Sequence, residues 1–448
     1  MTDADPQAPA PADPPDRAPA TAGPPDPSAA PAAPLARAAT LLRRPKLWVV
    51  PTVLSGLLAL LLSLLYMGGI VNPQGDLKDL PIALVNGDTG KPLPGQEQNL
   101  GTQITRSILA DTSSDKAEWR RLSRAEAQDE LDTGKVYGAL VIPADFTDSV
   151  AALTTTGAAE RPTITVLTNP GKGSLGSSLA SQISTQAAHQ ASQTIGEQLV
   201  QAAPRATATD KLLLADPVNV TPQVGHPLGD HSGLGLTAFY YTLLLVLAGF
   251  MGANVISNGV DTSLGYADNE IGPWHTRLPT VPISRTQTLL LKMAMTAGIT
   301  LVTVSLVMLA CVTLLGMDAT HLPLLWIYSY CASLAVGIGV QAINAAFGGI
   351  GQLVSMFVFI VLGLPSSGAT VPLQAVPGFY RFLSHFEPMR QLSDGVRAIL
   401  YFDARGDAGL SRSWLMIAIG TAVGLLFGYT MTLYYDRKGH RRLTPQPA

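Results

Sequence analysis

Acidic and amide side chains gather in two short turns of the sequence, where a bound metal ion is the chemistry that such a group could support. Asp88 follows Asn86 in one turn, and Asp148 follows Asp145 in the other. Their spacing matches none of the usual loops that surround a cation with oxygen ligands. Asp and Asn are also common in turns and at helix N-caps. We therefore interpret these residues as turn and cap residues and predict no metal ion.

Nucleophilic and acid–base chemistry has no candidate arrangement in this sequence. His189, His226 and His231 stand in no local motif, and no activated nucleophile is recognisable. Segments 87–91 and 169–174 resemble phosphate-binding loops, but neither has the Gly-x4-Gly-Lys-Ser/Thr spacing that wraps backbone N–H groups around phosphates. The sequence thus predicts neither an enzyme nor a chain with its own ATPase motif, and it predicts no cofactor.

The remaining polar side chains of interest lie within long apolar segments. Lys292 is the one clear charge there, close to the end of its segment, where its stem lets the ammonium group reach the interface. Ion-coupled transporters place Asp, Glu or His near the membrane midplane, and these segments do not. Four amide side chains lie toward the same ends of their segments: Asn254, Asn258, Gln341 and Asn344. They fit either a substrate path or hydrogen bonds between helices, and we favour the hydrogen bonds.

The composition is that of a membrane protein with a sizeable polar part. Of 448 residues, 47% are hydrophobic and only 14% are charged, which is too apolar for an ordinary soluble protein. The net charge of −3 gives no electrostatic reason to expect a nucleic-acid partner. Residues 1–34, rich in Ala and Pro, lack the apolar content to fold and are predicted to be a disordered tail. Cys311 and Cys331 are interpreted as small buried hydrophobic residues, with pairing of the two as the alternative.

Six apolar segments approach the length of about 20 residues that a membrane-spanning helix needs, although the fifth is short. They are Leu47–Met67, Leu236–Ile256, Leu289–Leu315, Leu324–Phe347, Leu353–Leu364 and Trp414–Tyr435. Basic residues flank the first and the last segment, and Arg277 and Arg285 lie between the second and the third. The positive-inside bias therefore places both termini and the loop 257–288 in the cytoplasm.

This topology predicts an α-helical polytopic protein of the plasma membrane, in contact with lipid, with six transmembrane helices arranged as one plus five. Its parts follow in order: a cytoplasmic tail 1–34, a first helix with its basic flank in 35–70, an extracytoplasmic α/β domain in 71–235, five helices in 236–436, and a basic cytoplasmic tail in 437–448.

The extracytoplasmic domain shows alternating strand and helix signals, which favour a small α/β fold. Strands are predicted over 81–86, 136–142 and 162–168, and helices over 96–110, 123–132 and 174–201. Ser123 followed by Glu126 is a capping-box pattern. The apolar stripe of the long helix packs either on its own domain or on a second copy.

Two further features concern packing. Gly420, Gly424 and Gly428 form a flat helix face, which allows either close packing within the chain or homodimerisation. Residues 365–412 are predicted to form an outer re-entrant or interfacial hairpin. Its apolar face comprises Met389, Leu392, Val396, Ile399 and Leu400, its polar face Arg390, Asp394 and Arg397, and its headgroup-level aromatics Phe379, Tyr380, Phe382 and Phe386.

One span, a large exterior domain and then five spans resemble the type 2 ABC exporter permeases, more narrowly the YhgE/Pip-like branch. Three stretches carry the resemblance: Ile82–Asn86 with Asp88 and Gly90, Gly134–Phe146, and Ser367–Phe379 continuing to Pro388 and Arg397. In such permeases the loop between the second and third spans forms a coupling helix that docks on a separate nucleotide-binding subunit. The residues here that match the coupling pattern are Glu270, Gly272, Arg277, Leu278, Pro282, Ser284, Arg285 and Lys292.

The resemblance implies a transmembrane permease subunit, homodimeric or heterodimeric, that exports a hydrophobic or amphipathic compound such as a drug or a lipid. ATP would act only through the partner ATP-binding cassette subunit, docked on loop 257–288. The alternative from the same branch is an ATP-independent membrane scaffold or receptor, similar to phage-infection proteins or secretion accessories, that acts through its exterior domain.

Overall fold

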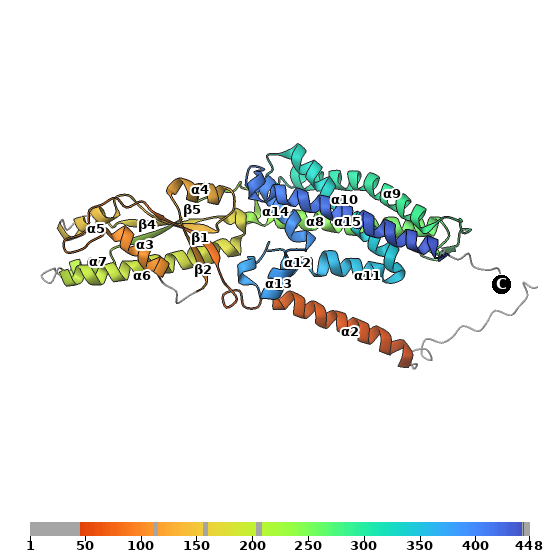
Figure 1. Cartoon of the computed structure of the whole chain (residues 1–448), viewed down its shortest axis with the longest axis horizontal. Helices are drawn as coiled ribbons and strands as arrows, with labels where there is room; N and C mark the ends of the chain where they lie inside the picture. The colour runs from red at the N-terminus through yellow and green to blue at the C-terminus, as the bar shows by residue number, and fades with distance from the viewer. Residues whose placement is uncertain (1–44, 111–114, 156–159, 203–207, 441, 443–448) are drawn as a thin grey trace, which may run out of the picture. The chain divides into compact units, whose positions relative to one another are not determined.

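The structure is a computed structural model that describes residues 45–110, 115–155, 160–202, 208–440 and 442 (Figure 1). The predicted tail 1–34 and the last residues of the tail 437–448 lie outside the described residues. The chain divides into two units, residues Met1–Leu60 and Leu61–Ala448. In the first unit the described residues belong to helix α2 (Pro45–Gly68), where Val53 and Leu57 are exposed apolar side chains.

The second unit contains a five-stranded sheet of order β2-β1-β3-β4-β5, in which only β3 and β4 pair antiparallel. Its strands are β1 (Leu80–Asn86), β2 (Ala117–Arg121), β3 (Gly138–Ile142), β4 (Thr163–Thr168) and β5 (Asn219–Val224). Its helices are α3 (Leu100–Ala110), α4 (Arg124–Asp132), α5 (Phe146–Thr155), α6 (Ser174–Ala202) and α7 (Ala208–Ala215), with a short 3₁₀ turn, η2 (Pro170–Lys172). Figure 1 shows α4 on one side of the sheet and α3 and α6 on the other.

Alternation along β1 explains these two layers, because successive side chains of a strand point to opposite faces. Leu84 packs with residues of α3, α5 and α6, whereas Ala83 and Val85 pack with α4. The three predicted strands and three predicted helices are confirmed, and the capping box of Ser123 and Glu126 is present. The apolar stripe of α6 packs on its own domain through Leu179, Ile195 and Leu199.

Four helical segments among the described residues are long and apolar enough to cross a membrane, which indicates a membrane protein: Thr237–Ser263, Arg285–Leu314, Leu322–Ser366 and Leu410–Arg437. They correspond to α8 (Thr237–Ser263), α9 (Arg285–Met308) with the π-helical η4 (Leu309–Leu314), α10 (Leu322–Phe347) with its continuation, and α15 (Leu410–Arg437). Apolar side chains such as Val255, Val302 and Leu426 are exposed on them, as a surface that faces lipid requires.

The segment Leu322–Ser366 reverses direction within its length. Gly348 has φ 59° and ψ −128°, a conformation that favours glycine, and it ends α10. The chain continues as η5 (Gly348–Ile350), α11 (Gly351–Met356), the π-helical η6 (Phe357–Val361) and α12 (Gly363–Ser366). Gly351 packs on Asn344, and the Phe359 ring packs on Gly339, so the second arm runs back along α10.

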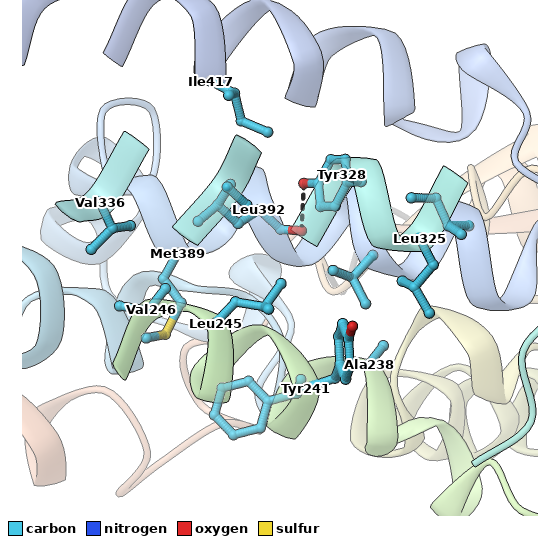
Figure 2. Close-up of a cluster of buried hydrophobic side chains, with 14 of the residues drawn as sticks. Ala238, Tyr241, Leu245, Val246, Leu325, Tyr328, Val336, Met389, Leu392 and Ile417 are labelled. Carbon is cyan, nitrogen blue, oxygen red and sulfur yellow. Dashed lines mark hydrogen bonds between the residues drawn. The ribbon is translucent and has the colours of Figure 1, made fainter. Parts of the chain in front are cut away.

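Buried apolar side chains of α8, α10, α15 and α14 (Pro388–Tyr401) form the core of the helical region (Figure 2). The Tyr328 hydroxyl lies inside this core and donates to the Leu392 carbonyl oxygen at 2.9 Å. Shorter elements complete the fold: η3 (Gly233–Gly235), η7 (Leu373–Ala375), α13 (Gly378–Leu383) and η8 (Gly406–Ala408).

Gly249 of α8 lies so close to α10 that a Cβ there would stand 2.5 Å from the Ser333 carbonyl oxygen, whereas Gly252 has open space. We expect Gly249→Val to destabilise the protein by about 1–3 kcal/mol, because overpacking moves the two helices apart. Thermal unfolding of the purified protein in detergent measures the effect. Gly252→Val is the matched control, and equal losses for the two variants would contradict the packing described.

Two residues of segment 365–412 are more buried than their predicted positions suggested. Arg397, expected on a polar face, is buried because it donates to the carbonyl oxygens of Gly368 and Ala369. Tyr380, expected at headgroup level, is also buried and donates to the carbonyl oxygens of Leu64 and Leu65. The other three aromatics of that group, Phe379, Phe382 and Phe386, are exposed.

Polar contacts join the sheet region to the C-terminal end of α14 and to the segment that follows it. His226 contacts a carboxylate oxygen of Asp132 through Nδ1 at 2.9 Å and the Tyr401 carbonyl oxygen through Nε2 at 2.7 Å. Lys135 pairs with Asp407 at 2.9 Å, and Arg405 pairs with Asp129 at 2.8 Å. These two exposed pairs contribute little to stability by themselves, but together with His226 they fix which end of the helical region the sheet region contacts.

Candidate functional site: a polar cavity between helices

A polar cavity of about 230 Å³ lies where α8 ends, α9 begins and α10 ends. Residues of α15 and the following segment complete its wall through Thr432 and Arg442. The main cluster of buried side chains in the helical region consists of apolar residues, most of them from α8, α10, α14 and α15. A water-accessible polar site among membrane-spanning helices costs packing energy, so such a site suggests a role in function.

A network of charges forms one wall of this cavity. The Lys292 ammonium group donates to the Ser257 hydroxyl at 2.9 Å and pairs with Asp261 at 2.9 Å. Asp261 also binds the guanidinium group of Arg442 through both carboxylate oxygens. The Lys292 side chain is only 8% exposed, and its charge is met by the Asp261 carboxylate and the Ser257 hydroxyl.

The four amide residues predicted near the helix ends all line this cavity: Asn254, Asn258, Gln341 and Asn344. Hydrogen bonds between helices are present as well. Gln341 donates to the Ala253 carbonyl oxygen at 2.9 Å, and Asn344 donates to the Asn254 side-chain oxygen at 3.0 Å. The amide oxygens of Gln341 and Asn344 are buried and accept no hydrogen bond from the part of the chain that the structure describes. These amide residues therefore both line a cavity, as a substrate path requires, and form hydrogen bonds between helices.

Capping interactions fix the start of α9 beside the cavity. Ser284 and Gln287 form a capping box. The Asp436 carboxylate accepts from the backbone N–H groups of Arg285 and Thr286, each at 3.0 Å. The Arg285 side chain donates to the His440 carbonyl oxygen at 2.6 Å. Ser284, Arg285 and Lys292, which match the coupling pattern, thus belong to the cavity wall and the helix cap, and they do not form an exposed docking face.

The loop before α9 is shorter than predicted and differs in structure. α8 extends to Ser263 and α9 begins at Arg285, which leaves residues 264–284. The coupling helix expected here is replaced by a hairpin of β6 (Asn269–Ile271) and β7 (Trp274–Thr276). Pro273, Pro279 and Pro282 remove N–H donors that a helix would need, and Gly272 turns the chain at φ 59°.

The hairpin carries an exposed surface, which we call the loop surface: Glu270, Gly272, Trp274, Arg277, Leu278, Val281 and Pro282. Trp274 is 72% exposed and Leu278 is 48% exposed. Arg277 pairs with the exposed Asp268, at 3.4 Å. Large exposed apolar side chains beside an unburied arginine are typical of binding surfaces.

Tyr266 connects this loop to the charged wall of the cavity. Its hydroxyl donates to the Val281 carbonyl oxygen at 2.7 Å, and its ring lies 4.8 Å from the Arg442 guanidinium carbon. Since Arg442 binds Asp261 and Asp261 binds Lys292, contacts run without a gap from the loop into the cavity. Sequence reasoning missed Tyr266, Asp261 and Arg442. The sequence did contain one signal for a charge pair between helices: Asp261 follows the second apolar segment, and Lys292 lies near the start of the third.

The three glycines of the flat face on α15 are not among the residues that line this cavity. Gly424 packs on Ile338 and Gly339, and Gly428 packs on Ala342, whereas Gly420 has open space. Gly420 and Gly424 line a second, almost wholly apolar cavity of about 510 Å³ between α10, α14 and α15. Two of the three glycines therefore serve packing within the chain.

Asp88, one of the acidic residues considered for a metal ion, has a structural role in the sheet region. Asp88 accepts hydrogen bonds from the backbone N–H groups of Gly90, Gly101 and Thr147 and from the Thr147 hydroxyl, so it caps α3 and joins it to the start of α5. Among the described residues, no group of three or more His, Cys, Asp or Glu side chains could hold a metal ion. Cys311 and Cys331 are free and half-buried against the apolar core.

Comparison with known proteins gives a family. No curated protein and no solved structure matches the chain. The family model described as "Protein of unknown function (DUF3533)" matches residues 51–431, which include the sheet region, the loop surface and the lining of the polar cavity except Thr432 and Arg442. The chain belongs to the DUF3533 family.

Proposed function

We propose that the protein is the transmembrane permease subunit of an exporter that moves an amphipathic or hydrophobic compound and is driven by a separate ATPase subunit. The ATPase docks on the loop surface. The sequence resemblance to type 2 ABC exporter permeases supports this function, and so does the polar cavity among apolar helices. The sequence has no phosphate-binding motif of its own, so the energy comes from the partner.

The observation that carries the proposal is the continuous contact from the loop surface to the cavity. A partner that pushes the hairpin also moves Tyr266, and through Arg442 and Asp261 it shifts the charges around Lys292. A permease needs such a path, because the chemical event and the transported compound are in different subunits. Arg285 adds a second route, since it joins the cap of α9 to the segment after α15.

We propose that the chain crosses the plasma membrane six times and that both termini and the loop surface lie in the cytoplasm. The reversal at Gly348 supplies two of the crossings, and α2 supplies the first. Arg437, Lys438 and Arg442 lie at the same end of the helices as Arg277 and Arg285, which fits the positive-inside bias. The sheet region is then extracytoplasmic, and the subunit pairs with a second permease subunit, identical or related.

Association with an ATPase tests this function. We expect the double variant Trp274→Ala, Arg277→Glu to lower co-purification of the ATPase by at least about tenfold, because anchoring aromatic and arginine side chains often contribute 2 kcal/mol or more each. Arg285 is unsuitable for this test, because its contacts belong to the fold. Arg124→Glu, an exposed charge reversal in the sheet region, is the matched control. Retention of the ATPase by the double variant would contradict the docking site.

A second function is favoured by one observation on the sheet region. A cleft of about 420 Å³ lies between α3 and α6 and ends at Trp119 of the edge strand β2. A scaffold or receptor that acts without ATP would use this cleft. In that case no ATPase co-purifies, and filling the cleft with Ala187→Trp abolishes the cellular phenotype while the loop-surface variant leaves it intact.

A further inference from the structure

The polar cavity carries more positive than negative charge. Lys292, Arg285 and Arg442 line it, and Asp261 is its one carboxylate. Asp261 is shared between Lys292 and Arg442. The nearby Asp436 is occupied by the backbone N–H groups that it caps. An anionic group in the cavity would therefore find cations that the protein has left incompletely neutralised.

Two further residues that line the cavity, Gln341 and Asn344, have buried acceptor oxygens without a donor among the described residues. Gln341 is 1% exposed, and its side-chain oxygen accepts no hydrogen bond from any described residue, while its nitrogen donates to Ala253 and Thr296. The Asn344 oxygen is in the same state, with its nitrogen bound to Asn254. Because each nitrogen already has an acceptor, rotating either amide by 180° would only exchange one unsatisfied atom for another. Buried acceptors of this kind are normally satisfied by a donor.

The cations and the unpartnered acceptors of this cavity together specify a ligand that is anionic and also donates hydrogen bonds. We propose that the cavity binds a phosphate ester that also bears hydroxyl or amino groups. The phosphate contacts Lys292 and Arg442, and the hydroxyl or amino group donates to Gln341 and Asn344. The volume of about 230 Å³ is below the roughly 300–1,000 Å³ of pockets for drug-sized molecules, and it suits a group of headgroup size.

Two sources can supply this chemistry: the headgroup of a phospholipid and a soluble phosphate ester. Basic pockets between membrane-spanning helices bind phospholipid headgroups by the same physical means. That the bound compound is also the transported substrate rests on the proposed permease function. Binding itself needs no ATPase and is tested without one.

The test is native mass spectrometry of the full-length protein purified in detergent and offered lipids of identical acyl chains. Phosphatidylglycerol and phosphatidylethanolamine carry a phosphate and donors, whereas phosphatidylcholine carries a phosphate and no donor. We expect phosphatidylglycerol and phosphatidylethanolamine to bind about tenfold more tightly than phosphatidylcholine. A buried acceptor that receives no hydrogen bond costs about 1 kcal/mol or more. Equal binding of the three lipids would overturn the proposal.

Variants of the charged wall locate the binding. Lys292→Gln and Arg442→Gln should each weaken phosphatidylglycerol binding about tenfold, because each removes a charge-assisted hydrogen bond to phosphate. Arg442 is only partly buried and follows the last helix, so its variant remains a test if Lys292→Gln fails to fold. The matched control is Arg437→Gln, an exposed cation outside the cavity. Equal losses for Arg437→Gln and the cavity variants would reject this site.

A soluble competitor identifies the source. Glycerol 3-phosphate that displaces phosphatidylglycerol at equal concentration assigns the cavity to a soluble phosphate ester, and failure to displace it assigns the cavity to lipid headgroups. Both results support the ligand chemistry. If no phosphate compound binds while the ATPase co-purifies, the ligand assignment fails and the permease function stands. If a phosphate compound binds while no ATPase co-purifies, the ligand assignment stands and the permease function fails.

Discussion

Replacing Asp261 with alanine is expected to lower the free energy of unfolding by about 3 kcal/mol, because it leaves the ammonium group of Lys292 buried without a counter-charge. Breaking a buried pair costs about 3–5 kcal/mol, and the 23% exposure of the Asp261 side chain places this case at the lower end. Ser257 would remain as the hydrogen-bond acceptor of Lys292, but a hydroxyl group does not neutralise a charge.

Denaturant unfolding of the purified protein in detergent measures this loss. Asp268→Ala is the matched control, since Asp268 pairs with exposed Arg277 and His275 and should cost less than about 1 kcal/mol. The double variant Asp261→Ala, Lys292→Met should recover most of the stability, because it removes both charges. Equal stability of the two single Asp variants would show that Lys292 is not held by this pair.

Acidification is expected to stabilise the helical region through Glu387. Burial raises the pKa of this carboxyl from its ordinary 4.5 to about 7, although backbone N–H groups of Met389 and Arg390 lower it in part. The folded state then binds a proton more tightly than the unfolded state. Stability is greatest below about pH 4.5 for this group and falls as the pH rises to 7, by about 3 kcal/mol in all.

The measurement is the unfolding midpoint between pH 4 and 8 in detergent. Glu387→Gln should flatten the dependence in this window, because the amide keeps an acceptor for the Arg390 N–H but does not titrate. Glu126→Gln, at the exposed cap of α4, is the control and should leave the window unchanged. The assignment is wrong if Glu387→Gln and the unchanged protein lose stability in parallel between pH 4.5 and 7.

Much of the fold follows from local patterns in the sequence. Continuous apolar runs predicted β1 and β3 and the long helices, and Ser123 with Glu126 predicted the start of α4. The strands β2 and β5 were missed, because both lie at sheet edges and carry polar sequences, AEWRR and NVTPQV. Only tertiary pairing with β1 and β4 makes them strands. Proline in β5 is tolerated because an edge strand leaves one side unpaired.

The candidate site was predictable only in part, because its residues are far apart in the chain. The amides Gln341 and Asn344 were recognisable as polar residues in an apolar helix. Gln341 and Asn344 line the same cavity as Arg442 because α15 packs along α10. No local sequence pattern predicts that packing. Arg397 is another residue whose environment depends on distant parts of the chain. A helical wheel places it on a polar face, but in the structure it is buried and donates to the carbonyl oxygens of residues 368 and 369.

The central claim is that an ATPase contacts the loop surface, and photo-crosslinking tests it most directly. A p-benzoylphenylalanine residue is placed at Trp274, which is 72% exposed, and for comparison at Phe382, which is 65% exposed in α13. After irradiation of intact cells, we expect a crosslink from position 274 to an ATP-binding cassette protein and none from position 382. Crosslinks to lipid alone from position 274, or the same ATPase crosslinked from both positions, would contradict this claim.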